Sequence, residues 1–503
     1  MSTFDPAPMS TAENQSLALG RSAVRGVAWS LVNNFVGRLG SFLAGILVVR
    51  LLATSEYGVY AIGMVVLAVL LSMNELGVSV AIVQHRGDVA EIAPTVMTVS
   101  IISSLAMAVV AWIAAPAAAA LMRAPEATGL IRLLLIAVVL DGIASVPNAL
   151  MSRLFQQRKR LLIDTTALVV SMPLTIVLAA TGHGAWSLGW GTVVGNAVTA
   201  GAALVWSPLR VSPGWDRAKV SALLRFGLPL AGASLLALLM LNVDYMIVGH
   251  QLGLAALGLY LLAFNLCSWP ITVVTSAIRR VATALFARIS EHFDDGGVTG
   301  FGHAFALVVG LTVPMCVLLA GFGPQLIGLL YGRRWLPAAV AMGPLALLSL
   351  VRVAVELTYD FLAGSGRTRS TVWLHGVWLV ALVPTLLLGA RYGIRGVAIA
   401  HAVVAAAVVT PTLAVLVGSA GLRVGALGRY LLRPAVGAVV MFAVIVSARL
   451  LFGPTITAML LGSPVAIAAY VACVWPLRVE AVLLWQLKAP VARRNAPSVE
   501  SEA

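Results

Sequence analysis

The sequence predicts an all-α, polytopic membrane protein of about 14 transmembrane helices. They form two six-helix lobes related by a parallel repeat, plus two C-terminal helices. Composition is the first reason: 60% of the 503 residues are hydrophobic and 10% are charged, with a mean hydropathy of +0.99. A soluble chain of this length could not bury so much apolar surface, so lipid must be its solvent. The second reason is a pattern that recurs about 200 residues along the chain.

Two pairs of short segments carry this repeat. The first is Leu52-Ala53-x-x-x-Tyr57-Gly58-x-Tyr60, which recurs as Leu252-Gly253-x-x-x-Leu257-Gly258-x-Tyr260. The second is Arg158-x-Arg160 followed by Gly184, which matches Arg367-x-Arg369 followed by Gly393 at a nearly equal offset. Two similar halves are typical of a transporter, because halves that rock about a central site give alternating access.

Apolar runs of about 17 to 25 residues predict the individual spans. In the first half they lie near 24–49, 59–80, 95–120, 129–150, 165–181 and 185–206. In the second half they lie near 223–249, 257–278, 301–322, 338–362, 372–390 and 397–418, and two more follow near 433–452 and 459–476. The predicted domains are a cytoplasmic tail (1–23), an N-terminal six-helix lobe (24–206), an inter-lobe cytoplasmic loop (207–222), a C-terminal six-helix lobe (223–418), two extra helices (419–476) and a second cytoplasmic tail (477–503).

Lys and Arg gather in alternate loops, which predicts that those loops and both termini are cytoplasmic. Because each half has an even number of spans, both halves insert the same way up, with the pseudo-axis along the membrane normal. The longest outward loop is expected around 323–337. No loop has room for a soluble catalytic domain, so we do not expect an enzyme.

The remaining composition excludes several classes of function. The net charge of +14 follows from the positive-inside loops. The sequence has no basic patch interleaved with aromatic residues, so we do not expect nucleic-acid binding. The three cysteines fall in apolar runs without C-x-x-C spacing, and the histidines show no ligand spacing, so we expect neither a metal site nor a cofactor.

Ionisable residues inside spans are the candidate functional residues, because they are costly in lipid and usually face a cavity or each other. Arg38 lies midway along the first span with Asn34 one turn before it, and an arginine fork suits a phosphate ligand. The alternative is a structural ion pair with a neighbouring helix.

A second row of charges lies in one later span. Arg352, Glu356 and Asp360 recur every four residues and share one helix face. Arg352 and Glu356 could simply pair within the helix. Glu356 and Asp360 are also candidates for coupling to a proton or cation.

Other positions are weaker candidates. Asp244 in the seventh span and Asp141 in the fourth could serve transport or lobe packing, and Arg132 is of the same kind. Arg279 and Arg280 are candidates for the cytoplasmic mouth, where anchoring by the positive-inside rule explains them equally well.

Glycines at two places predict close helix contacts. Gly58 and Gly258 begin equivalent helices, and Gly191-x-x-x-Gly195 is a helix-packing motif of low specificity.

Four ordered segments resemble one family of membrane proteins. They are Val49 to Gly58, Asn242 to Gly249 with Leu252-Gly253 and Leu257 to Tyr260, Leu330 to Ala339, and Tyr392 to Ala398. Between about Arg21 and Gly418 the chain is therefore similar to polysaccharide flippases of the Wzx type, in the multidrug/oligosaccharidyl-lipid/polysaccharide exporter superfamily. The nearest branch contains colanic-acid and teichuronic-acid exporters.

The resemblance implies a bacterial inner-membrane protein that flips an undecaprenyl-diphosphate-linked oligosaccharide for exopolysaccharide, capsule or O-antigen synthesis. It implies a cationic cavity between two six-helix lobes, and other polysaccharide assembly proteins that polymerise the repeat. If the protein is ion-driven, the expected coupling ion is H⁺ or Na⁺. A multidrug exporter or a lipid II flippase of the same superfamily stays open as an alternative, as does a membrane glycan polymerase. The first span holds Arg38 and no acid, which favours an anionic cargo over a cationic drug.

Overall fold

The computed structural model is helical throughout its described part, which comprises residues 42–74, 88–154, 156–272, 298–364, 368–419 and 424–475 with Gly40 and Ile82. The chain divides into two compact units, Met1–Gly258 and Leu259–Ala503. Eleven described helices are long and apolar enough to cross a membrane, and the shorter helices Phe42–Leu51 and Leu374–Ala390 are also apolar. The prediction of an all-α polytopic membrane protein is confirmed.

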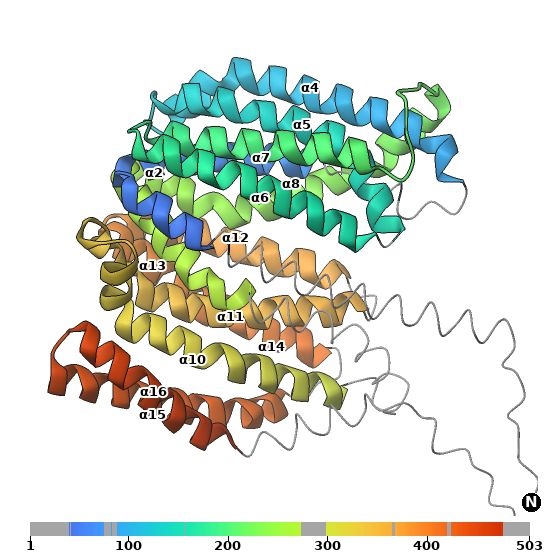
Figure 1. Cartoon of the computed structure of the whole chain (residues 1–503). Helices are drawn as coiled ribbons and strands as arrows, with labels where there is room; N and C mark the ends of the chain where they lie inside the picture. Colours follow the sequence, from blue (N-terminus) through green and yellow to red (C-terminus); the bar gives the residue numbers. More distant parts are fainter. Residues whose placement is uncertain are drawn as a thin grey trace, which may run out of the picture. The chain divides into compact units, whose positions relative to one another are not determined.

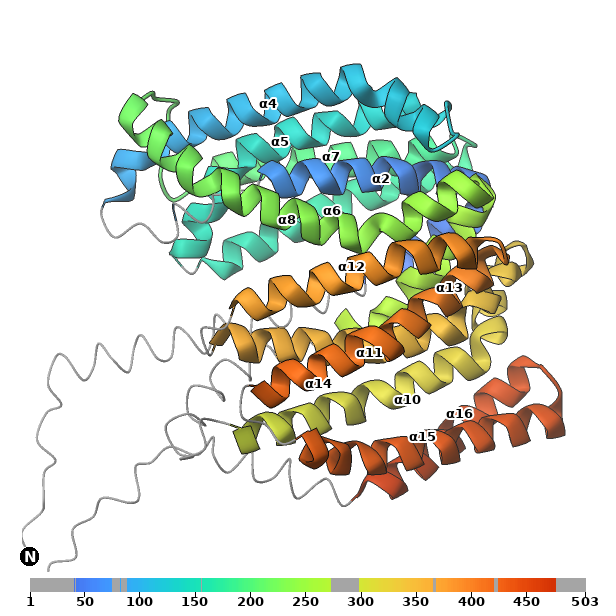
Figure 2. The same cartoon turned by 180° about the vertical axis from the view of Figure 1, so that it is seen from behind.

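Unit 1 is built from antiparallel neighbours that lie side by side in Figures 1 and 2. Its helices are Phe42–Leu51, α2 (Thr54–Asn74), α4 (Val89–Leu121), α5 (Ala127–Arg153), α6 (Gln157–Ala180), α7 (Ala185–Trp206) and α8 (Arg217–Leu252). The helix α5 is central, because it packs against α2, α4 and α7. The lobe boundary predicted between α7 and α8 stays a prediction, while α8 packs within this unit against α2 and α4.

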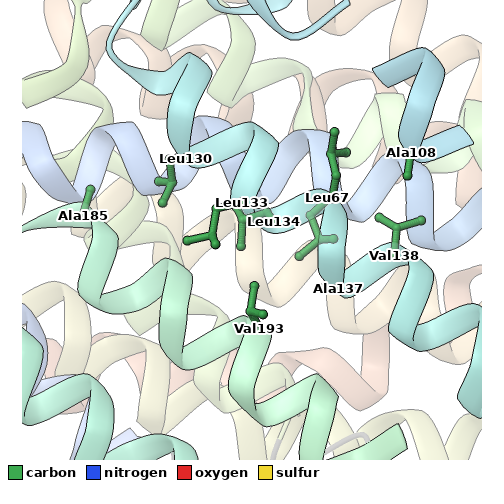
Figure 3. Packing of buried hydrophobic residues seen from close by; sticks show 10 residues of the cluster. Leu67, Ala108, Leu130, Leu133, Leu134, Ala137, Val138, Ala185 and Val193 are labelled. Carbon is green, nitrogen blue, oxygen red and sulfur yellow. The ribbon is translucent and has the colours of Figure 1, made fainter. Parts of the chain in front are cut away.

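The core of unit 1 is the apolar face of α5. Leu130, Leu133, Leu134, Ala137 and Val138 recur at helical spacing and are buried against Leu67 of α2, Ala108 of α4 and two residues of α7 (Figure 3). On the same α4–α5 interface the hydroxyls of Ser100 and Ser145 lie 2.8 Å apart. Membrane helices associate through close packing of small residues and through interhelical hydrogen bonds, because the hydrophobic effect does not drive helices together within lipid.

Unit 2 contains most of the helix Leu254–Thr272 and all later elements. These are α10 (Val298–Leu330), the 3₁₀ helix η1 (Arg333–Ala338), α11 (Ala339–Gly364), α12 (Thr368–Ala390), α13 (Gly393–Val404), the π-helical turn η2 (Ala405–Val409), α14 (Thr410–Ser419), α15 (Val424–Phe452) and α16 (Ile456–Val474). The helices α13, η2 and α14 form one continuous apolar segment, Gly393–Ser419. The last two helices pair with each other and pack against α10.

The connection predicted around 323–337 is shorter than expected, because 323–330 belong to α10 and only the turn at 331–332 and η1 separate α10 from α11. The helix α10 bends at Phe322, whose φ of −112° and ψ of 17° are not helical, and then continues to Leu330. Pro324 causes the bend because its ring clashes with the carbonyl one turn earlier and it lacks an N–H. The side chain of Arg449 on α15 donates a hydrogen bond to the carbonyl of Gly321, next to the bend, at 2.9 Å, which stabilises the bent form.

Most predicted span limits lie close to the observed ones, and α7 matches its prediction of 185–206. Two helices begin well before their predicted limits. The helix α15 begins at Val424 instead of 433, and α6 begins at Gln157 instead of 165, so Arg158, Lys159 and Arg160 lie on the first turn of α6. Basic side chains extend a helix past the apolar limit because their stems cover apolar surface while their charges reach the interface. The Lys159 ammonium illustrates this by donating to the carbonyl of Trp206 at 3.3 Å.

The repeated glycines meet in a reciprocal contact. A Cβ on Gly58 would overlap the carbonyl oxygen of Leu254, and a Cβ on Gly258 would overlap that of Thr54. The two contacts are related by the same shift of about 200 residues that relates the sequence patterns. The first turn of α2 therefore crosses the first turn of the helix Leu254–Thr272 at backbone contact, as the repeat predicts for two equivalent helices.

Candidate functional site: a polar cavity in unit 1

A cavity of about 400 Å³ opens inside unit 1. Its wall is formed by the helix Phe42–Leu51, α2, α6 and α7, and its polar members are Tyr57, Tyr60, Asp164, Ser171, Thr175, Thr192, Asn196 and Thr199. Polar side chains gathered between membrane helices indicate a water-filled space, since lipid cannot satisfy their hydrogen bonds.

The α6 side of the cavity carries its carboxylate. Asp164, Ser171 and Thr175 lie on one face of the helix, at intervals of about two turns and one turn. Asp164 is solvent-exposed, near the start of α6, and Thr175 is buried, with its hydroxyl donating to the Ser171 carbonyl at 2.8 Å. The α6 wall of the cavity therefore runs from an exposed carboxylate at Asp164 to a buried hydroxyl at Thr175.

The α7 side presents hydroxyl and amide groups. Thr192 lies 3.2 Å from the Tyr60 hydroxyl, so α2 and α7 are joined at the cavity wall. The Asn196 side-chain nitrogen donates to the Thr192 carbonyl at 2.9 Å. This bond points the amide so that its carbonyl oxygen is the atom available to a ligand. Thr199 continues the same helix face one turn further.

Glycines bring these two walls together. A Cβ on Gly191 would overlap the hydroxyl of Thr175, and one on Gly195 would lie 3.4 Å from the Cβ of Ser171. The small residues of α7 thus face the polar residues of α6, which is the close approach that the Gly-x-x-x-Gly spacing predicts. The same spacing shapes the cavity, because it places the hydroxyls of both helices on one wall.

The size and chemistry of the cavity limit what it can hold. Drug-sized ligand pockets measure about 300–1,000 Å³, so this cavity suits a single sugar ring or a hydrated ion. Its lining supplies one carboxylate, several hydroxyls and an amide oxygen, and oxygen ligands of this kind suit a hard cation or a proton. Within the described residues no group of three His, Cys, Asp or Glu is placed to hold a metal ion.

The sequence-predicted residues do not gather in this cavity. Asn34, Arg38, Arg279 and Arg280 lie outside the described residues, as does the side chain of Asp360, whose backbone belongs to α11. Asp141 is half-buried in α5. Asp244 is fully buried in α8, where its Oδ1 accepts a hydrogen bond from the Tyr245 backbone at 3.0 Å.

A second polar cluster lies in unit 2, on α11. The guanidinium of Arg352 sits over the ring of Phe264, 5.2 Å from its centroid, and lies 3.4 Å from the Ser268 hydroxyl. Ser349, one turn earlier, donates to the Cys267 carbonyl at 2.7 Å. Glu356 follows Arg352 by one turn and is half-buried. The polar face of α11 therefore packs against the helix Leu254–Thr272.

Sequence reasoning missed Asp164, because the predicted span began one residue after it and left it in a loop. The signal that could have found the cavity was present in α7, where Thr192, Asn196 and Thr199 recur at helical spacing inside an apolar run. The same spacing on α6 links Asp164 to Ser171 and Thr175 once the helix is extended.

The sequence is similar to those of known polysaccharide biosynthesis proteins. A family model described as "Polysaccharide biosynthesis protein" matches residues 47–340. The chain is 24% identical over 376 residues to the succinoglycan biosynthesis transport protein ExoT of Rhizobium meliloti (strain 1021), covering 74% of this chain and 75% of that protein. It is 21% identical over 382 residues to the lipopolysaccharide biosynthesis protein WzxC of Escherichia coli (strain K12), covering 75% and 76%.

Solved structures share the fold. The lipid II flippase MurJ in an inward closed conformation matches with a TM-score of 0.71, over 92% of this chain and 100% of that chain, at 14% identity. An inward-facing multidrug resistance MATE family transporter of the MOP superfamily matches with a TM-score of 0.62, over 80% and 99%, at 20% identity. Identities this low show the fold alone, an all-α bundle of many membrane helices.

Proposed function

From the premise that this chain belongs to the family of polysaccharide biosynthesis proteins, we propose that it flips undecaprenyl-diphosphate-linked oligosaccharide repeat units across the bacterial inner membrane. The family is one of Wzx-like exporters of the MOP superfamily, and its members are transporters rather than enzymes. The cargo moves from the cytoplasmic to the periplasmic leaflet by alternating access. The named relatives support a polysaccharide cargo, since ExoT and WzxC are named for succinoglycan and lipopolysaccharide biosynthesis.

The observation that carries this proposal is the open, polar-lined cavity between the apolar helices of unit 1. A protein that only scaffolds other proteins has no need of an exposed carboxylate and a wall of hydroxyls between membrane helices. At about 400 Å³ the cavity is too small for a whole lipid-linked oligosaccharide. We assign it to the coupling ion, H⁺ or Na⁺, with Asp164 as the charged ligand.

Coupling requires that the ion bind the two conformations differently, because a ligand shifts an equilibrium only by its differential affinity. Asp164 lies at the entrance of the cavity, where movement of the surrounding helices changes how well the hydroxyls of α6 and α7 complete its coordination. Glu356 and Asp360 remain proposed as a second coupling pair. Arg38 with Asn34 is proposed to bind the diphosphate, and Arg279 with Arg280 to receive it at the cytoplasmic mouth.

The proposal is tested in oriented membrane vesicles from a strain that lacks the protein. A lectin that cannot cross the bilayer reports which leaflet holds the lipid-linked repeat. We expect the repeat to remain on the cytoplasmic face, and the wild-type chain to restore its access to the periplasmic face. If the repeat reaches the periplasmic face without the protein and only polymer is missing, flipping is wrong and an assembly role replaces it.

The assignment of the cavity is tested in the same vesicles with Asp164→Asn. We expect this variant to be inserted normally but to lose its response to an imposed H⁺ or Na⁺ gradient, since the charge that binds the ion is gone. The matched control is Asp88→Asn. Asp88 is the exposed N-cap of α4 and accepts from the Ala90 N–H, and asparagine caps equally well. Equal loss in both variants would remove the cavity from the coupling step.

A further inference from the structure

A second hollow lies on the outside of unit 1, along the hairpin of α4 and α5. It measures about 230 Å³ and is lined by Ala108, Val109, Trp112, Ile113, Arg132, Leu135, Ile136 and Val139. Its rim is apolar and exposed: Ile113 is 73% exposed, Val109 52% and Trp112 50%. On a helix that crosses a membrane, such residues face acyl chains, so this groove opens toward lipid.

The only charged residue in the groove is Arg132, which lies on the second turn of α5, about 8 Å from the helix start. Its guanidinium sits over the Trp112 ring at 5.1 Å from the centroid. Its Nε is buried and has no hydrogen-bond partner among the described residues. Among the described residues no ion pair of Arg132 is found.

A cation at this depth requires an anion, because an arginine left alone in hydrocarbon is expensive. The hydrocarbon core is about 30 Å thick, and a side chain that starts about 8 Å from its edge reaches the phosphate level by extending outward. The anion abundant at that level is the lipid phosphate. A guanidinium binds phosphate oxygens through its planar fork, and the Trp112 ring fixes the orientation of that fork.

We propose that the α4–α5 groove is a binding site for an anionic glycerophospholipid of the surrounding bilayer. The phosphate binds Arg132 beside Trp112, and one acyl chain lies in the groove between Val109, Ile113 and Ile136. The groove volume fits part of an acyl chain and no whole head group, so the head group beyond the phosphate extends from Arg132 toward the α4–α5 turn. The lipid belongs to the leaflet that contains the α4–α5 turn.

This site is separate from the polar cavity. The groove is lined from α4 and α5, whereas the cavity is lined from the helix Phe42–Leu51, α2, α6 and α7. The two share no lining residue. The bound lipid would tie α4 to α5 between 108–113 and 132–139, nearer the α4–α5 turn than the Ser100–Ser145 contact, and so support the hairpin that packs around the core of unit 1.

The test uses native mass spectrometry of the full-length protein in detergent, with phosphatidylglycerol as the anionic probe and phosphatidylethanolamine as the zwitterionic one. We expect the first phosphatidylglycerol to bind wild type at least about tenfold more tightly than phosphatidylethanolamine. Arg132→Gln should weaken phosphatidylglycerol binding about tenfold, because the charge-assisted bonds to phosphate are lost. Arg132→Lys, which keeps the charge without the fork, should be intermediate.

The matched control is Arg123→Gln, which removes the same charge from the α4–α5 turn but lies outside the groove. It should leave phosphatidylglycerol affinity unchanged. Trp112→Leu keeps the apolar rim, removes the ring above Arg132 and should also weaken binding. Equal affinity for the two lipids, or an equal loss in Arg123→Gln, overturns the proposal in favour of unspecific surface attraction. Displacement of phosphatidylglycerol by an equimolar polyprenyl phosphate overturns the assigned occupant.

Discussion

At Gly58 the backbone of α2 touches the carbonyl oxygen of Leu254, and no side chain stands between them. The variant Gly58→Ala must push apart two backbones, which cannot rotate out of the way as a side chain could. We expect it to lower the free energy of unfolding by about 1–3 kcal/mol, the usual cost of overpacking. Gly258→Ala should behave alike, because its Cβ would meet the carbonyl of Thr54. Thermal unfolding in detergent measures both.

The control for this pair is Gly201→Ala on the exposed side of α7, where an added Cβ meets nothing within 4 Å. That variant should be neutral or slightly stabilising, because alanine favours a helix over glycine. If Gly58→Ala unfolds at the same temperature as Gly201→Ala, the crossing is looser than the structure has it and the reciprocal contact does not hold α2 in place.

The candidate site could be predicted from the sequence only where it lies inside a continuous apolar run. Thr192, Asn196 and Thr199 show their shared face by spacing alone. Asp164 could not be found that way, since a carboxylate at the end of a span looks like a loop residue until the helix is known to start at Gln157. Which face of a membrane helix meets a cavity and which meets lipid depends on tertiary packing, as Arg132 shows. The sequence makes Arg132 a weak candidate for transport or packing, and the structure places it in an apolar groove between α4 and α5.

The last two helices, α15 and α16, lie outside the predicted repeat but pack tightly against α10. Met441 and Ile445 of α15 and Ala466 and Tyr470 of α16 are buried in one apolar cluster with Phe322 of α10. The Tyr470 hydroxyl donates to the Gly310 carbonyl at 2.8 Å. This bond and the one from Arg449 to Gly321 both join the last helices to the part of α10 that precedes the bend at Phe322.

Removing the Arg449 bond should loosen this assembly. Arg449→Ala leaves the Gly321 carbonyl without its donor at the bend, and hydrogen bonds that involve a charged group contribute about 1.5–3 kcal/mol. We expect a lower thermal midpoint and faster proteolysis at the end of α15. Arg391→Ala in the exposed turn before α13 removes the same charge and should leave both unchanged. A normal midpoint in Arg449→Ala would mean that the apolar cluster alone holds the last helices.

The bend itself marks the limit of element prediction. Apolar runs located most helices because each span must satisfy its backbone internally and so is long and uniform. At Gly323 and Pro324 the residues are those of a turn, and the sequence therefore predicts a loop. The helix continues to Leu330 because its far end is buried against neighbours, with Ile327 inaccessible to solvent. Tertiary packing overrides local turn preference here.

For the whole molecule, the fold class follows from composition and hydropathy, since no other solvent than lipid accommodates a chain with 60% hydrophobic residues. The positions of most helices along the chain also follow from hydropathy, whereas the two-lobe repeat stays a prediction. How the chain divides into compact units does not follow. The lobe boundary that the repeat predicts before α8 stays a prediction, while the packing of α8 against α2 and α4 depends on side-chain shapes that a hydropathy pattern does not contain.

Orientation in the membrane is a property of the whole chain, and basic residues that indicate it lie at one end of unit 1. Lys159 reaches the carbonyl of Trp206, and Lys219 reaches that of Glu91 at 3.0 Å. The starts of α6, α8 and α4 and the end of α7 therefore share one end of the unit. Arg210 lies in the loop that follows α7 at this end. The opposite end contains the α6–α7 turn at Thr181, so the positive-inside rule predicts a cytoplasmic Arg210 and an external Thr181.

This orientation is tested with single cysteines in a chain whose three native cysteines are replaced by serine. A maleimide that cannot cross the membrane should label Thr181→Cys in cells whose outer membrane has been opened, because Thr181 is exposed at the external end. It should label Arg210→Cys only after the inner membrane is permeabilised. Both positions are exposed, so a difference in labelling reports the side of the membrane and not burial. The reverse pattern would invert the topology and, with it, the direction in which the proposed cargo is moved.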